Sequence, residues 1–184
     1  MILDGLLQFT GTSRGATATV ANGVNTDLPT TGAQVSSNII DLGILGLPLS
    51  ASGGGARDIG IGDDPAMKIL IQVITALTGG TSLQINMQGA PDNGAGAPGT
   101  FVIYASGPIV AEASLIPGAR LFDIDMPRPA LDFPPPRFLQ LGYVSAGTHA
   151  AGAIQGYLVL DRFDLPSNAN AVLGGYPAGI NIAN

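Results

Sequence analysis

The sequence predicts an all-β protein in which about eight short strands form a sandwich or a jelly roll. Short segments of alternating or continuous apolar residues recur along the chain, as expected for strands. Gly and Pro, which number 27 and 14 among the 184 residues, separate these segments with turn signals. The best helical candidate, Ala111 to Leu115, covers about one turn before Pro117 and Gly118 end it.

Two neighbouring segments are predicted to form a β-hairpin. Lys68 to Ala76 is β-branched and mostly apolar, which indicates a strand that is buried on both faces. Ser82 to Gln88 alternates polar and apolar residues, which is typical of a half-buried strand. Thr78 to Thr81 contains two glycines and is predicted to form the hairpin turn. The core-facing residues of the second strand are expected to be Leu83, Ile85 and Met87.

A second hairpin is predicted near the end of the chain, where Phe138 to Val144 and Ile154 to Leu160 flank a loop of small residues, Ser145 to Ala153. Before it, Arg120 to Met126 alternates, with apolar residues on one face and Asp123 and Asp125 on the other. The remaining strand candidates are Leu6 to Thr10, Ser37 to Leu42, Thr100 to Ala105 and Ile109 to Ala111.

Long loops surround these strands within one domain that covers residues 1–184. Loops of this length are uncommon unless they are functional or flexible. They carry apolar side chains that need a partner surface, so we expect them to act as interaction segments. The four interaction segments are residues 11–36, 43–55, 127–136 and the tail 165–184. Their expected apolar anchors are Leu45, Leu47, Leu49, Phe133, Tyr176 and Ile180, with Arg57 and Arg137 as polar clamps.

The composition provides few side chains that could catalyse a reaction or bind a metal. The chain has no Cys and no Trp, one His (His149), and only 11% charged residues, against about 25% in an ordinary soluble domain. A net charge of −6 with seven basic residues argues against nucleic-acid and anionic-membrane partners. The start of the chain does not resemble a signal peptide. We expect no cofactor, no metal and synthesis in the cytoplasm.

Three candidate sites are interpreted as structural. Asp123 and Asp125 could form a carboxylate pair for glycoside hydrolysis, but the same spacing arises on any solvated strand face. His149 has no nucleophile partner in the sequence and is expected to be exposed in a loop. Asp92 and Asn93 precede Gly94 and predict a turn rather than a calcium site, because such side chains bond their own backbone.

An ordered set of segments resembles the capsid cement (decoration) proteins of tailed bacteriophages, over most of the chain. Two regions depart from that pattern, because residues 12–35 and 44–55 look longer than in those proteins. The segments that carry the resemblance are Met1 to Asp4, Asn38 to Gly43, Ala56 to Gly62, Gln84 to Asp92, Gly96 to Thr100, Phe122 to Pro127, Arg137 to Tyr143, Ala151 to Ile154, Leu158 to Asp161 and Tyr176 to Gly179.

The resemblance implies a jelly-roll-like antiparallel β-sandwich with long loops and extended termini. It also implies a non-enzymatic virion structural protein on the outer capsid surface. Such a protein forms homo-oligomers, dimers or trimers, and clamps neighbouring major capsid proteins. The alternative is a carbohydrate-binding or adhesin-like β-sandwich on a virion surface, which would need aromatic platforms. A hydrolase that uses Asp123 and Asp125 is the third hypothesis.

Overall fold

The computed structural model describes residues 2–11, 26–43, 67–125 and 136–160. These residues form eight β-strands and one short 3₁₀ helix, η1, and every strand pairing is antiparallel. The prediction of an all-β fold of about eight antiparallel strands is therefore confirmed. The elements are β1 (Ile2–Gln8), β2 (Thr31–Val35), β3 (Ile40–Asp41), β4 (Lys68–Ala90), β5 (Val102–Ser106), β6 (Val110–Ala111), η1 (Glu112–Ser114), β7 (Arg120–Asp125) and β8 (Phe138–Leu160).

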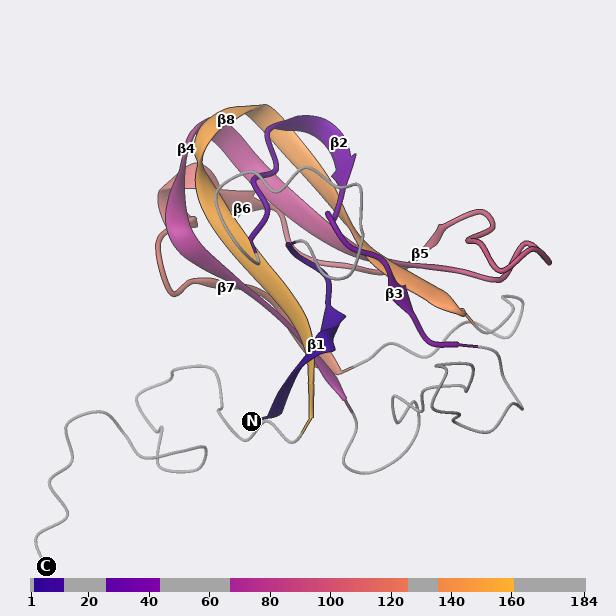
Figure 1. Cartoon of the computed structure of the whole chain (residues 1–184). Helices are drawn as coiled ribbons and strands as arrows, with labels where there is room; N and C mark the ends of the chain where they lie inside the picture. Colours follow the sequence, from indigo (N-terminus) through magenta and orange to yellow (C-terminus); the bar gives the residue numbers. More distant parts are fainter. Residues whose placement is uncertain (1, 12–25, 44–66, 126–135, 161–184) are drawn as a thin grey trace, which may run out of the picture.

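Two long strands, β4 and β8, organise the fold (Figure 1). They pair along their whole length, and their register shifts only between Val73 and Ser82 of β4. At these shifts the two strands bend over together, at the top of Figure 1. Gly79, Gly147 and Gly152 lie in this bend with positive φ angles, which favour glycine. We call this region the bend.

The bend turns one sheet into two facing layers, because each half of the β4–β8 pair recruits its own neighbours. In the first layer β7 flanks β4 and β1 flanks β8. In the second layer β5 and β6 flank β4, while β2 and β3 flank β8. The chain is thus a β-sandwich made by folding a single sheet onto itself.

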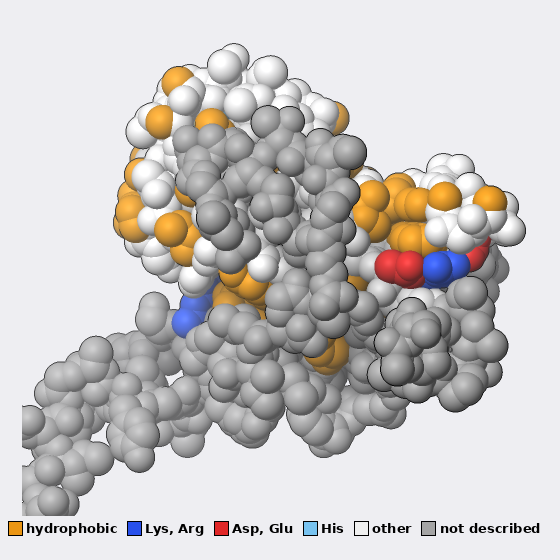
Figure 2. All heavy atoms as spheres, viewed as in Figure 1, with side chains coloured by type: hydrophobic (Ala, Val, Ile, Leu, Met, Phe, Trp, Pro, Cys, Tyr) orange, Lys and Arg blue, Asp and Glu red, His pale blue; other side chains and the backbone are white. Residues whose placement is uncertain are grey.

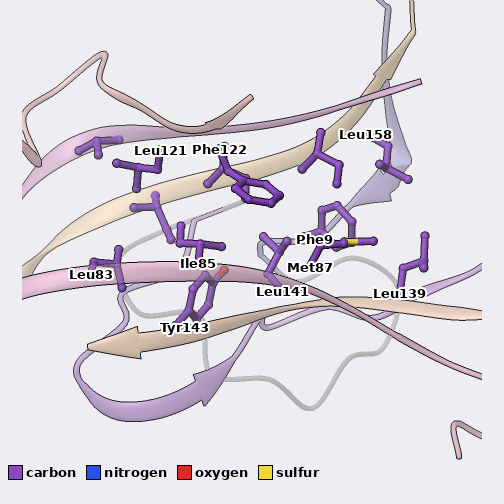
Figure 3. Packing of buried hydrophobic residues seen from close by; sticks show 14 of the residues in the cluster. Phe9, Leu83, Ile85, Met87, Leu121, Phe122, Leu139, Leu141, Tyr143 and Leu158 are labelled. Atoms are coloured by element: carbon purple, nitrogen blue, oxygen red, sulfur yellow. The ribbon is translucent and has the colours of Figure 1, made fainter. Parts of the chain in front are cut away.

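Apolar side chains from both layers fill the space between them (Figure 3). Leu83, Ile85 and Met87 are all buried there, as the alternating pattern predicted. The consecutive residues Ile69, Leu70 and Ile71 are also buried, which confirms that this part of β4 is covered on both faces. Complete burial of one such side chain stabilises the fold by about 1.5–3 kcal/mol.

Both predicted hairpins are wrong, and for the same reason. Thr78 to Thr81 does not reverse the chain, because the segments on either side of it both pair with β8 rather than with each other. Ser145 to Ala153 likewise lies within β8. Glycines and small residues permit a sharp change in backbone direction. Such a change occurs in a bent strand as well as in a turn, so the sequence pattern is the same for both.

A strand was also missed within the interaction segment 11–36, where Thr31–Val35 forms β2. Its sequence, Thr-Gly-Ala-Gln-Val, has low strand propensity, and pairing with β8 supplies the stabilisation instead. The alternating strand near Arg120 is confirmed as β7, although the side chains of Asp123 and Asp125 lie outside the described residues. No helix within the described ranges is long and apolar enough to span a membrane.

Candidate functional site

Of the eight side chains predicted to form an interface, the structure describes only Arg137. The other seven lie outside the described residues, and their role stays a prediction. These seven are Leu45, Leu47, Leu49, Arg57, Phe133, Tyr176 and Ile180. The structure does show where the stretches of chain that contain them meet the described part of the sandwich.

The first group of attachment points lies where the first layer ends, away from the bend (Figure 1). Lys68 pairs with both Asp125 and Val159, and Ile2 pairs with Leu160. The described range that begins at Met67 therefore starts beside the point where the same range ends at Asp125. The last described range ends at Leu160 in the same place.

The second group lies where the second layer ends, again away from the bend (Figure 1). The backbone N–H of Leu42 donates to the carbonyl oxygen of Arg137 at 2.8 Å, and Asp41 pairs with Phe138. One described range ends here at Gly43, and another begins here at Pro136. We call these two groups of attachment points together the open side of the sandwich.

Arg137 holds the second group together through a cluster that we call the Arg137 clasp, made of Arg137, Asp41, Asp92 and Phe138. The guanidinium Nε donates to Oδ1 of Asp41 at 2.8 Å and Nη2 donates to Oδ2 at 2.9 Å. Nη1 donates to the carboxylate of Asp92. The guanidinium also lies over the ring of Phe138, 4.8 Å from its centroid. The clasp therefore joins β3, β8 and the loop that follows β4.

The Asp92 side chain organises the loop on which it lies, as the turn prediction requires. Its Oδ1 accepts the backbone N–H of Gly94 at 2.7 Å and that of Gly96 at 3.0 Å, and both glycines have positive φ. The Gly94 hydrogen bond lowers the pKa of Asp92, with further lowering from Gly96 and Arg137. Oδ1 of Asp92 therefore accepts the hydrogen bonds of the turn, and Oδ2 accepts the hydrogen bond from Arg137 in the clasp.

A buried polar network, which the sequence did not reveal, lies elsewhere in the fold. The Asp27 carboxylate accepts the hydroxyl of Tyr143 at 2.8 Å and the backbone N–H of Ser37 at 2.9 Å. The backbone of Asp27 forms two hydrogen bonds with that of Ile154, each 2.9 Å long. Burial and the nearby Asp27 raise the pKa of Tyr143 well above its usual range. Because Asp27 and Tyr143 are both buried, this network can join segments but cannot meet a large substrate.

The expectation that His149 is exposed in a loop is wrong. The side chain is only 1% exposed, because the bend places it under the segment that precedes β2. The backbone N–H of His149 donates to the carbonyl oxygen of Thr30 at 2.8 Å, and ring Nδ1 lies 3.1 Å from the carbonyl oxygen of Pro29. A Cβ atom at Gly80 would lie 2.2 Å from the ring. His149 is therefore a packing residue of the bend.

Charged side chains are few on the described part of the surface that Figure 2 shows. Within the described residues, no three His, Asp or Glu side chains lie close enough together to hold a metal ion. Apolar side chains are exposed on several strands and around η1. The larger ones are Val35, Ile39, Ile74, Ile103, Ile109, Ile116 and Val144. This surface offers contact area rather than ionisable groups.

A comparison with protein families places most of the chain in a known family. A family model described as Bbp16 matches residues 24–158, which is well over half of the chain. The matched range includes β2 to β7 and nearly all of β8, and hence both layers of the sandwich. No curated protein matches the sequence.

Proposed function

The chain belongs to the Bbp16 family, and we propose that it is a capsid decoration (cement) protein of a tailed bacteriophage. In this proposal it is a non-enzymatic virion structural protein. Copies of it form homo-oligomers on the outer capsid surface and clamp neighbouring major capsid proteins, which stabilises the head against internal pressure.

The observation that carries the proposal is the open side of the sandwich. Three of the four predicted interaction segments, 43–55, 127–136 and 165–184, belong to stretches of chain whose described ends lie at this side. A protein that binds by several segments needs them to start from one side, so that all of them can reach the same partner surface. The bend, on the opposite side, would then face away from the capsid.

The composition supports the same proposal. A surface that stays covered in an assembly is depleted of charge, and only 11% of this chain is charged. Each contact can be weak, because a lattice engages many copies at once and linked contacts strengthen one another by a factor of about 10²–10⁴. Side chains with acid–base or nucleophilic chemistry are not needed for this mechanism.

The test is co-sedimentation of the purified chain with DNA-filled capsids of the phage that encodes it. We expect the full chain to sediment with capsids, and a variant lacking residues 44–49 to lose binding while it keeps its β-sheet circular dichroism. Ile109→Ser is the matched control, because it changes an exposed apolar residue that directly precedes β6, close to the bend. We expect this variant to bind capsids as the original chain does.

Size-exclusion chromatography with light scattering should show a dimer or trimer in the free state. Failure of the full chain to bind capsids would refute the proposed function. Strong hits on a glycan array would favour the carbohydrate-binding alternative instead, although the chain has only ten Phe and Tyr residues and no Trp to form sugar platforms.

A further inference from the structure

We propose that β2, which is an edge strand among the residues that the structure describes, accepts an extended segment of the major capsid protein as one further strand. This inference rests on the proposed function and names a second contact, separate from the open side. Strand addition to a free edge is a common way of recognising an extended peptide, because the backbone of the edge supplies the hydrogen bonds.

The position of β2 makes it an edge. It pairs with β8 on one side, and no strand among the described residues lies on its other side. Gly32 to Val35 pairs with Ser145 to Gly142 in unbroken register. Every residue of β2 except Gln34 is exposed. Gly32 has a positive φ of 62° beside the register shift, and the exposed residues that follow it present a row of backbone N–H and C=O groups to an incoming chain.

The usual protection of such an edge is missing from β2 beyond its first residue, where the register shifts between Thr31 and Gly32. Natural edge strands are shielded by charged residues, Pro or β-bulges, whereas Gly32 to Val35 contains none of these. The edge strand β5 on the other border of the same layer differs in where its register shifts, because its shift falls at Tyr104, in the middle of the strand, and not at its first residue. A bulge of this kind disturbs further pairing, so β2 is the better acceptor of the two.

The side chains beside the edge indicate the chemistry of the partner. Val35 is 56% exposed and Val144 is 44% exposed. Ala33 pairs with Val144, and since side chains alternate along a strand, Val35 lies on the same outer face. Within this layer, the segments 31–35, 82–88, 102–106 and 140–146 contain no charged residue, and Asp41 of β3 lies at the far end of the layer, where β8 begins. An incoming strand with uncharged, apolar alternate residues would fit this surface.

The size of the edge favours a capsid lattice over a second copy of this chain. Five residues of strand span about 17 Å at a rise of about 3.3 Å per residue. Pairing two such edges buries far less than the roughly 1,000 Å² that a stable, specific interface needs. A capsid protein present in many ordered copies does not need that area at each site, because other contacts of the same molecule hold it in place.

The experiment compares Val35→Lys with Ile116→Lys in the full-length chain, using DNA-filled capsids as the probe. Both parent side chains are 56% exposed, so the two substitutions place the same charge at equally exposed sites. We expect Val35→Lys to weaken capsid binding at least about tenfold, because a lysine on an edge opposes strand pairing. Ile116→Lys should bind as the original chain does, and Val35→Thr, which stays uncharged and β-branched, should retain most binding.

Hydrogen exchange on the original chain provides a second readout that needs no variant. Exchange of the amides in residues 31–35 should slow when the chain is bound to capsids. Equal binding by the two lysine variants, or unchanged exchange, would overturn the inference while leaving the proposed function intact. Loss of self-association in Val35→Lys, with capsid binding retained, would also overturn it and assign the edge to a second copy. Absence of capsid binding by the original chain would refute both proposals.

Discussion

Replacing Tyr143 by Phe removes a single oxygen atom from the buried network around Asp27. The Tyr143 hydroxyl donates to Oδ2 of Asp27 at 2.8 Å, and both side chains are buried. Asp27 is bound to β8 at two places, through this hydroxyl and through its backbone bridge to Ile154. The substitution therefore loosens the attachment of the segment before β2 without changing the size of the core.

The expected loss of stability depends on the hydrogen bonds that the Asp27 carboxylate keeps after the substitution. A hydrogen bond to a charged group contributes about 1.5–3 kcal/mol. Since the N–H of Ser37 still donates to the same oxygen at 2.9 Å, we expect the lower part of that range, about 1.5–2 kcal/mol. For a chain of this length, such a loss lowers the melting temperature by about 3–8 °C.

Denaturant and thermal unfolding, followed by circular dichroism, measure this effect. Tyr157→Phe is the matched control, because Tyr157 is a half-buried residue of the same strand whose hydroxyl has no hydrogen bond to any residue that the structure describes. We expect the control to change the free energy of unfolding by less than about 0.5 kcal/mol. Equal losses for the two variants would refute the assignment of Asp27 and Tyr143 as a stabilising network.

Alkaline pH provides an independent check on the same residue. The pKa of Tyr143 in the folded protein lies well above the usual value of 10.0, so above pH 10 the unfolded tyrosine loses its proton while the folded one keeps it. The stability that this group contributes is present below pH 10 and is lost as the pH rises, by up to about 1.4 kcal/mol per pH unit. Phe has no such proton, so the stability difference between the original chain and Tyr143→Phe should shrink above pH 10. A constant difference would contradict the raised pKa.

Two further predictions concern the bend and the clasp. Gly80→Ala should destabilise the fold by about 1–3 kcal/mol, because the added Cβ would lie 2.2 Å from the His149 ring. In a double-mutant cycle, Gly80→Ala should cost much less stability when His149 is already replaced by Ala. If the stability losses of the two substitutions simply add, the packing role of His149 is contradicted. Arg137→Met should lower the melting temperature at pH 7. The pKa of Asp92 lies below its usual value of 3.8, so the stabilising charge of Asp92 is present above pH 3.8 and is lost as the pH falls. The difference in melting temperature between Arg137→Met and the original chain should therefore become smaller below pH 3.8. A difference that does not depend on pH would argue against the Arg137–Asp92 pair.

The candidate site was predictable only in part. Arg137 was expected to act as a polar clamp, yet nothing in its neighbourhood indicated that Asp41 and Asp92 would bind it. These three residues are far apart in the sequence and meet only because β3 pairs with β8 beside the end of β4. Asp27 lay in a segment expected to be a loop, and its burial depends entirely on contacts with distant residues.

The sequence by itself determined the all-β class, the inward residues of β4 and the turn at Asp92, since each follows from local periodicity or from a side chain bonding its own backbone. Only the tertiary structure decided whether Gly79 and Gly80 would end a strand or bend it. A glycine permits both conformations, and the choice depends on whether the flanking segments pair with each other or with a third strand. In this chain β8 pairs with both segments, and that single pairing forms the bend, buries His149 and places the attachment points of three interaction segments on the open side.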